Sequence, residues 1–318
     1  GAVPGQCRSG VCDLCAPVSC DDGSPCTIDG TCNPNNGQCQ GGQNVANGVS
    51  CGDAAYVCSQ GVCVNDALRH DTYTGQNPVE GIFSIQSSTS YRYGQAGFYL
   101  NFLGSGVDHE IEEITSGWFL TVVSGGEPTT VGYLIYADRN ADDDYSYRFN
   151  SQELPIGTSI PSIVTGSSAG GTVDTNIGSI PAGYTPVLVA FSVDRGTDHN
   201  LKRLSVQLYP SGSQVRLIVR YADNGADDGY AYAVRYALVP SHRVRAFDSH
   251  SRSGITGSDT QAIAAQRPIL MGFDLNFESD HHVDQVGVQL DPGTLYVWFN
   301  DQNNDDRFSY EVRWADLQ

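Results

Sequence analysis

Three short acidic segments contain the residues best suited to chemistry in this chain of 318 residues. Each follows the pattern aromatic-x-Asp-x-[Asn/Gly]-x-Asp-Asp-x-aromatic-x-Tyr, and the three copies begin at Tyr136, Tyr221 and Phe299. Side-chain oxygens at the first, third and fifth positions of such a loop can converge on one hard cation, as they do in the first half of an EF-hand. The pattern predicts calcium sites with the following candidate ligands: Asp138, Asn140, Asp142, Asp143, Asp223, Asp227, Asp228, Asp301, Asn303, Asp305 and Asp306.

Plain turns are the alternative interpretation of these segments, because Asp, Asn and Gly are ordinary turn residues. No Glu stands at the twelfth position, so further oxygens would have to come from the backbone, water or a neighbouring loop. Gly225 replaces Asn in the middle copy, which should make that site the weakest. Clustered carboxylates repel one another, and the same cluster recurs in all three copies, so the calcium hypothesis is favoured.

An Asp-His pair precedes each acidic segment, at Asp108-His109, Asp198-His199 and Asp280-His281. A His beside an Asp could bind a metal or act as a general base. Recurrence at one position of three repeats is more typical of a turn in which the Asp caps the backbone. The sequence also lacks His-Glu-x-x-His and Gly-x-x-x-x-Gly-Lys segments, so we assign no catalytic residue and expect no enzyme activity.

A set of aromatic residues could either stack on sugar rings or pack between subunits. The alternative is that most of them fill the cores of small β-domains, and for any single residue this alternative is favoured. The set comprises Tyr91, Tyr93, Tyr145, Tyr147, Tyr230, Tyr232, Tyr236, Trp298 and Trp314.

The recurrence of these landmarks divides the second part of the chain into three homologous repeats. Runs such as Leu295–Phe299 are rich in β-branched and aromatic residues, and Phe308–Trp314 alternates apolar with polar residues. We therefore expect about seven short strands in each repeat, with the acidic segment at the tip of a hairpin. The predicted fold is mainly β, with an N-terminal disulfide-rich small module followed by three tandem small β-sandwich or jelly-roll-like domains. The expected boundaries are residues 1–66 for the module and residues 67–157, 158–240 and 241–318 for the repeats.

All ten cysteines lie in the first of these segments, which indicates a disulfide framework in place of an apolar core. Structural zinc is the rival interpretation, since Cys12 and Cys15 have the spacing of metal ligands. Five disulfides are expected among Cys7, Cys12, Cys15, Cys20, Cys26, Cys32, Cys39, Cys51, Cys58 and Cys63. The chain begins at Gly1 without Met, as expected of an exported protein whose signal peptide has been removed.

The formal net charge is −19, and Lys202 is the single lysine. A surface this acidic repels phosphate backbones and anionic lipid. Binding to nucleic acid or to a membrane surface is therefore not expected. No apolar stretch reaches the roughly 20 residues that a spanning helix needs, so membrane insertion is not expected either.

Two resemblances add to these inferences. The segment from Cys20 to Cys39, with Asp21-Asp22-Gly23-Ser24-Pro25 inside it, resembles Cys-rich modules of proteins secreted by myxobacteria and their relatives, which implies an extracellular location. The strand pattern from Pro268 through Asp280-His281 to Leu290 is similar to that of H-type-lectin-like domains. That second resemblance implies a six-stranded sandwich that forms trimers and binds sugars.

Together these features predict an extracellular structural or adhesive protein. Its expected role is that of a subunit of a calcium-stabilised filament, sheath or surface assembly, with self-association into a homopolymer. The alternative is a secreted carbohydrate-binding, lectin-like protein whose partners are glycans.

Overall fold

A computed structural model describes residues 6–8, 11–16, 18–52, 56–77, 81–87, 92–102, 111–122, 128–137, 145–195, 201–222, 229–281, 283–301 and 307–318. The protein is mainly β, as predicted, and the described residues include one short 3-10 helix, η1 (Ser241–Arg243). The chain forms two compact units, residues 1–67 with 155–157 and residues 68–154 with 158–318. We call the first the Cys-rich unit and the second the β-body. No helix in the described part of the chain is long and apolar enough to cross a membrane.

The Cys-rich unit consists of four short antiparallel strand pairs, β1–β2, β3–β6, β4–β5 and β7–β8. The strands are β1 (Gln6–Arg8), β2 (Val11–Asp13), β3 (Thr27–Ile28), β4 (Thr31–Asn33), β5 (Gln38–Gln40), β6 (Gln43–Asn44), β7 (Tyr56–Ser59) and β8 (Val62–Asn65). Pairs this short bury little apolar surface, so covalent links must hold them together.

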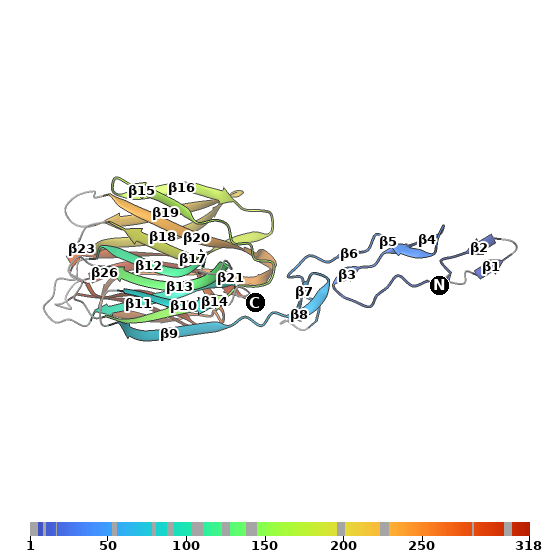
Figure 1. The fold of residues 1–318 in the computed structure, drawn as a ribbon. Helices are drawn as coiled ribbons and strands as arrows, with labels where there is room; N and C mark the ends of the chain where they lie inside the picture. The colour runs from blue at the N-terminus through green and yellow to red at the C-terminus, as the bar shows by residue number, and fades with distance from the viewer. Residues whose placement is uncertain are drawn as a thin grey trace. The chain divides into compact units, whose positions relative to one another are not determined.

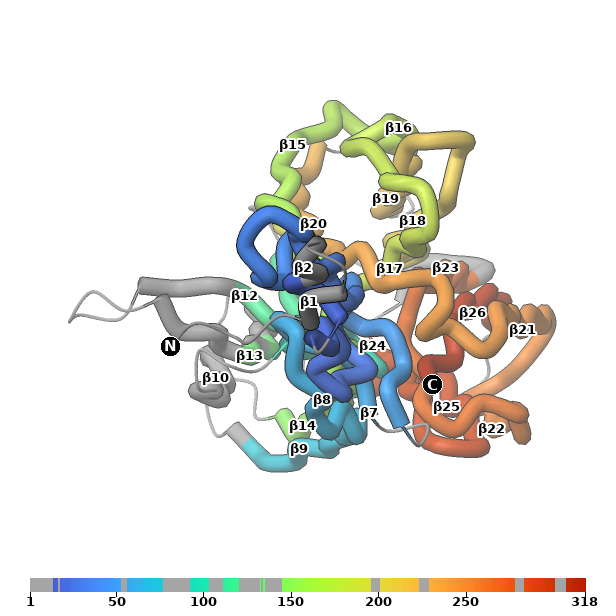
Figure 2. Tube along the Cα trace, turned by 90° about the vertical axis from the view of Figure 1, so that its right-hand side faces the viewer, coloured from blue at the N-terminus to red at the C-terminus, as the bar shows by residue number. Residues whose placement is uncertain are grey.

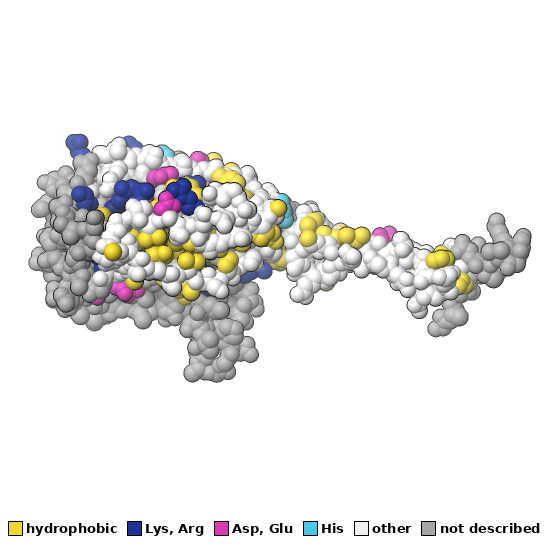
Figure 3. All heavy atoms as spheres, turned by 90° about the horizontal axis from the view of Figure 1, so that it is seen from above, with side chains coloured by type: hydrophobic (Ala, Val, Ile, Leu, Met, Phe, Trp, Pro, Cys, Tyr) yellow, Lys and Arg dark blue, Asp and Glu magenta, His cyan; other side chains and the backbone are white. Residues whose placement is uncertain are grey.

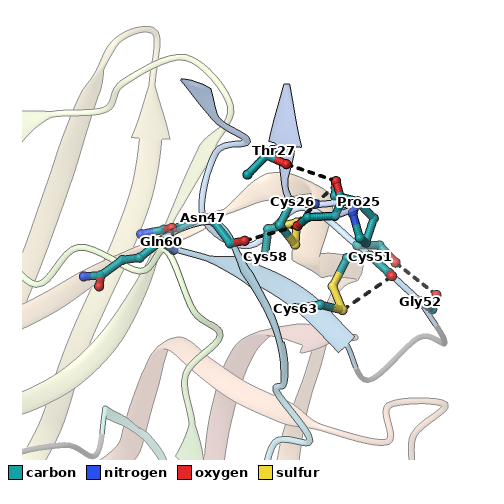
Figure 4. Close-up of a disulfide and its surroundings, with 12 residues drawn as sticks. Pro25, Cys26, Thr27, Asn47, Cys51, Gly52, Cys58, Gln60 and Cys63 are labelled. Atoms are coloured by element: carbon teal, nitrogen blue, oxygen red, sulfur yellow. Dashed lines mark hydrogen bonds between the residues drawn. A yellow bond between two sulfur atoms is a disulfide. The ribbon is translucent and has the colours of Figure 1, made fainter. Parts of the chain in front are cut away.

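Four disulfides supply these links: Cys15–Cys32, Cys20–Cys39, Cys26–Cys58 and Cys51–Cys63. Figure 4 shows the last two where they tie β7 and β8 to the preceding chain. The disulfide framework is thus confirmed for eight cysteines. Cys7 and Cys12 lie opposite each other in the backbone register of β1 and β2, but their side chains lie outside the described residues, so the fifth bridge stays a prediction.

The β-body contains six strands from each repeat rather than about seven. The first repeat supplies β9 (His70–Asn77), β10 (Gly81–Ser87), β11 (Tyr93–Phe102), β12 (Glu113–Val122), β13 (Pro128–Ala137) and β14 (Tyr145–Glu153). The second supplies β15 (Val164–Ser168), β16 (Thr172–Ser179), β17 (Tyr184–Asp194), β18 (Leu201–Ser211), β19 (Gln214–Ala222) and β20 (Tyr230–Pro240). The third supplies β21 (Val244–Thr256), β22 (Ser258–Ala262), β23 (Pro268–His281), β24 (Val283–Asp291), β25 (Thr294–Asp301) and β26 (Arg307–Leu317) (Figure 1).

These strands form three six-stranded sheets, and each sheet is shared between two repeats. Their orders are β10-β13-β12-β17-β20-β15, β16-β19-β18-β23-β26-β21 and β22-β25-β24-β11-β14-β9. In each, the second, fifth and fourth strands of one repeat are followed by the third, sixth and first strands of the next. The third repeat joins the first through β24 and β11, so the arrangement closes into a ring.

This sharing corrects the expectation that each acidic segment lies at a hairpin tip. The strands on either side of it, such as β13 and β14, belong to different sheets. The alternating pattern of Phe308–Trp314 correctly indicates one buried face, but alternation does not reveal which strand lies alongside. In each repeat the hairpin joins instead the fourth and fifth strands: β12–β13, β18–β19 and β24–β25.

The three repeats meet at a shared core. Figure 2 shows their strands in three sectors around a common centre. The third strands of the repeats place Phe98, Phe191 and Phe273 together there, with ring centroids 5.2 to 5.4 Å apart. All three rings are fully buried, and the main core cluster contains residues from every repeat. The burial of this shared core stabilises the three repeats as one unit.

Candidate ligand-binding face

The outer face of the sheet that joins the third repeat to the first is the candidate functional site. Side chains alternate between the two faces of a strand, so the burial of Leu295, Val297 and Phe299 in the core turns their neighbours outwards. On β25 the outward residues are Tyr296, Trp298 and Asn300. The same alternation turns Tyr99 and Asn101 outwards on β11, and β24 adds Gln285. We call these six residues the aromatic–amide face.

Strand register arranges the face in rows that cross the sheet. One row runs Trp298–Gly287–Tyr99–Arg148–Thr74 across β25, β24, β11, β14 and β9. The row on one side of it contains amides and a hydroxyl: Asn300, Gln285, Asn101, Ser146 and Gln76. The row on the other side contains Tyr296, Gln289, Gly97, Asn150 and Thr72.

The three aromatic rings form one continuous surface. The Tyr296 and Trp298 rings are nearly parallel, at an angle of 9° with their centroids 5.4 Å apart. The Tyr99 and Trp298 rings approach to 4.6 Å across Gly287, which has no side chain to separate them. All three rings are half-buried, and burial raises the pKa of the Tyr99 hydroxyl, so that hydroxyl stays neutral at physiological pH.

The amide row is pre-arranged by hydrogen bonds between its own side chains. Asn300 donates to the Gln285 side-chain oxygen at 3.0 Å, Gln285 donates to Asn101 at 2.9 Å, and Asn101 donates to the Ser146 hydroxyl at 3.1 Å. An amide has two donors and an acceptor with two lone pairs, so each retains hydrogen-bonding capacity toward a ligand.

Equivalent positions on the other two sheets carry different chemistry. Where the face has Trp298 and Tyr99, the second sheet has Arg220 and Asp274, which form an ion pair at 3.3 Å. Arg203 also binds Asp274, with both of its contacts below 3 Å. Figure 3 looks down on the side of β15 and β16, where basic and acidic side chains lie together. None of the described side chains in the three rows of the aromatic–amide face is acidic, although the chain as a whole carries −19.

The structure separates the aromatic residues that the sequence analysis grouped. Six of them are buried, as the core interpretation expected: Tyr145, Tyr147, Tyr230, Tyr232, Tyr236 and Trp314. Tyr93 is buried as well, and burial raises its pKa to about 12. Tyr91 lies outside the described residues. Among the described members of the set, Trp298 alone is on the outer face, and sequence reasoning missed its neighbours Tyr99 and Tyr296. The alternation Leu-Tyr-Val-Trp-Phe-Asn at 295–300 carries the signal that could have identified Tyr296.

Apart from Asp301, the predicted calcium ligands lie outside the described residues, as do two of the three Asp-His pairs. Asp301 and the pair Asp280-His281 end strands β25 and β23, but their side chains are not described. A different acidic group is described in the Cys-rich unit, where one carboxylate oxygen each from Asp21, Asp22 and Asp29 lies within 4.8 Å of the others. These side chains are exposed and could hold a divalent cation.

No family model and no curated protein matches this chain. Among solved structures it is similar to the major capsid protein P2 from bacteriophage PM2, with 9% sequence identity, 54% of this chain and 98% of that chain covered, and a TM-score of 0.21. So low a TM-score carries no argument about fold or function.

Proposed function

We propose that this chain is an extracellular adhesive protein that binds carbohydrate on its aromatic–amide face. The observation that carries the proposal is the continuous surface of Tyr296, Trp298 and Tyr99 beside a row of amides. A sugar ring has apolar C–H faces that pack on aromatic rings, and its hydroxyl groups both donate and accept hydrogen bonds, as amides do.

The extracellular location is supported by the disulfides. Four bridges within residues 15–63 are stable in an oxidising compartment and rare in a reducing one. An adhesive role also suits the β-body, because a closed ring of shared sheets holds the face on paired strands rather than on loops.

Binding of the full chain to an array of immobilised glycans tests the proposal. We expect retention on a subset of glycans, and loss of that retention in Trp298→Ala. Phe247→Ala is the matched control, since Phe247 is an exposed aromatic residue on β21, in a different sheet. Absence of binding to every glycan, or equal binding by Trp298→Ala, would contradict the proposal.

A structural role in a self-assembling filament or surface layer is the second candidate. It is favoured by the outer strands of the three sheets, β9, β10, β15, β16, β21 and β22, each of which pairs on one side only among the described residues. Unpaired strand edges can pair with another chain unless residues such as Lys block them, and the sequence has one Lys.

Divalent ions should control such assembly, because calcium would neutralise the acidic chains that otherwise repel one another. Sedimentation and electron microscopy of the full chain in calcium and in chelator test this role. Calcium-dependent polymers are expected, and a chain that stays monomeric at high concentration in calcium would exclude it.

A further inference from the structure

We propose that the aromatic–amide face binds the inner units of a linear, uncharged polysaccharide that lies across the strands, rather than a single terminal sugar. This inference rests on the proposed function and specifies the ligand of the same face. Three properties of the face carry it: its length, its polar flanks and its lack of acidic groups.

The row that contains Trp298 and Tyr99 extends across the whole width of the sheet. Ser258 on β22 lies beside Trp298 at one end, and Thr74 on β9 lies beside Arg148 at the other. Six strands at a spacing of about 4.8 Å give a row of roughly 24 Å, several times the width of one sugar ring. Both end residues are small and exposed, so the row continues to both edges of the sheet.

The two rings close over the middle of the row, so a polymer chain would lie on the rings. Gly287 lies between Trp298 and Tyr99, and a Cβ added there would lie 2.7 Å from the Tyr99 Cα. Gly287 is buried, and the two rings meet across it to form one stacking surface. A polymer that stacks on these rings can pass over Gly287 and onward toward Arg148.

Polar side chains lie on both sides of this path. The amide row of Asn300, Gln285 and Asn101 follows one side. On the other side Gln289 is buried and bonded to Arg148 and Asp291, so Tyr296 and the exposed Thr72 supply the hydroxyl groups there. A linear polysaccharide presents hydroxyl groups along both of its edges, so each successive unit meets donors and acceptors. A terminal monosaccharide would use only a small part of this arrangement.

The charges on and around the face favour an uncharged polymer. Arg148 is the only charged side chain in the three rows, and it donates a hydrogen bond to Gln289 at 3.2 Å. The net charge of −19 repels a polyanion at long range. The Asp291 carboxylate beside the third row already accepts hydrogen bonds from Gln289 and Asn150, and the rows themselves contain no carboxylate.

Affinity electrophoresis and calorimetry on the full chain test the inference with defined probes. The probes are curdlan, mannan, soluble cellulose oligosaccharides and agarose as uncharged linear polymers, with alginate and hyaluronan as polyanions. We expect binding to at least one uncharged polymer and none to the polyanions. For the polymer that binds, affinity should rise with the number of sugar units up to about four or five, the number that fits the row, and then level off.

Variants then separate a chain-binding row from a single-sugar site. Trp298→Ala and Tyr99→Ala should each weaken polymer binding about tenfold or more, whereas Phe247→Ala should not. Thr74→Trp places a bulky ring at one open end of the row. It should reduce binding of long oligosaccharides and leave that of disaccharides unchanged, and its unfolding temperature reports whether the fold is intact.

Several results would overturn the inference. One is full competition by the free monosaccharide at the concentration where the polymer saturates, and another is an affinity independent of chain length. In either case a terminal sugar is bound, and the proposed function stands without this inference. Stronger binding to alginate than to uncharged polymers, or no binding to any probe, also overturns it.

Discussion

At the scale of single residues, position in the ring of strands decides the chemistry of a side chain. Tyr99, Ser192 and Asp274 occupy equivalent places on the third strands of the three repeats. Tyr99 belongs to the surface of aromatic rings, and Ser192 carries a small hydroxyl group. Asp274 forms ion pairs with two arginines. The repeats therefore share a backbone plan while their outer faces differ, which is why a single face can be specialised for a ligand.

Asp259 provides a residue-scale prediction about pH. Burial disfavours its charged form, but hydrogen bonds from Tyr310 at 2.6 Å and from Gln261, with the nearby Arg252, outweigh burial and lower its pKa. A carboxyl whose pKa is lower in the folded protein stabilises the fold above its ordinary pKa of about 4. That contribution is lost as the pH falls through the lowered value.

The expected outcome is that Asp259→Asn loses stability at pH 7 but differs less from the wild type in strong acid. Urea unfolding of both proteins at a series of pH values measures this difference. A gap between the two curves that stays constant down to the lowest pH would show that Asp259 acts through packing rather than through its charge.

At the scale of strands, the seams between repeats follow one recurring design. Each third strand has an irregularity in register, at Gln95/Gly97, Leu188/Ala190 and Leu270/Gly272. Beside it, a side chain from the sixth strand reaches a backbone carbonyl of the neighbouring repeat. Arg235 donates to Trp118 O and Arg313 to Leu208 O, both at 3.1 Å, while Asn150 donates to Leu290 O at 3.5 Å. These bonds satisfy carbonyl groups that the irregularity would otherwise leave unpaired.

A glycine at each seam permits the close approach of the two strands. In two seams it is on the third strand, where Gly97 faces Gln289 and Gly272 faces Gln207. In the other seam Gly117 faces Ala190, and a Cβ at position 117 would lie 2.2 Å from the Ala190 Cα. Gly117→Gln should therefore destabilise the β-body. The cost of overpacking should be at least about 1–3 kcal/mol.

Adding Ala190→Gly to Gly117→Gln should restore the part of that loss that comes from the Ala190 Cβ, which would lie 2.5 Å from a Cβ at position 117. The strain of a residue other than glycine at a φ of +130° should remain. Urea unfolding of the two single variants and the double variant gives the coupling between the sites. Additive effects, with no rescue, would contradict the seam interpretation.

The Cys26–Cys58 disulfide joins residues 32 apart in sequence, and both cysteines are fully buried. Cys26→Ala with Cys58→Ala removes a constraint worth about 3–4 kcal/mol for a loop of this length. We expect faster proteolysis within residues 18–65 while the β-body keeps its unfolding temperature. Cys51→Ala with Cys63→Ala is the comparison, since its shorter loop of 12 residues predicts a smaller loss. An unchanged rate of proteolysis in both variants would mean that packing, not the bridges, holds the unit.

The sequence was sufficient to predict the strands, the repeats and the disulfide framework, because alternation and cysteine spacing are local signals. It did not predict that the third strand of one repeat pairs with the fourth strand of another. The partner of β11 is β24, almost 190 residues further along the chain, and nothing in the alternation of Gly97–Phe102 specifies it. The candidate face was missed for the same reason, because Tyr99 and Trp298 become neighbours only through this pairing.

At the scale of the whole β-body, the ring leaves no repeat with a sheet of its own. Each repeat contributes half of two sheets, and both ends of the β-body chain, at Leu68 and Leu317, lie in one core cluster. Unfolding any one repeat would therefore remove three strands from each of two sheets. Because such a loss exposes the cores of the other repeats, the β-body should unfold in a single cooperative step.

Phe273→Ala tests this cooperativity at the point where the three repeats meet. Removal of the ring leaves a cavity beside Phe98 and Phe191, at a cost of about 3–5 kcal/mol. Since the three repeats share that core, hydrogen exchange should become faster by a similar factor in the most protected amides of β11, β17 and β23. A loss of protection confined to the third repeat, or two separate thermal transitions within the β-body, would instead mean that the repeats are independent domains. The single-step outcome would show that the three repeats, among them the two joined by the β11–β24 pair that assembles the aromatic–amide face, unfold as one unit.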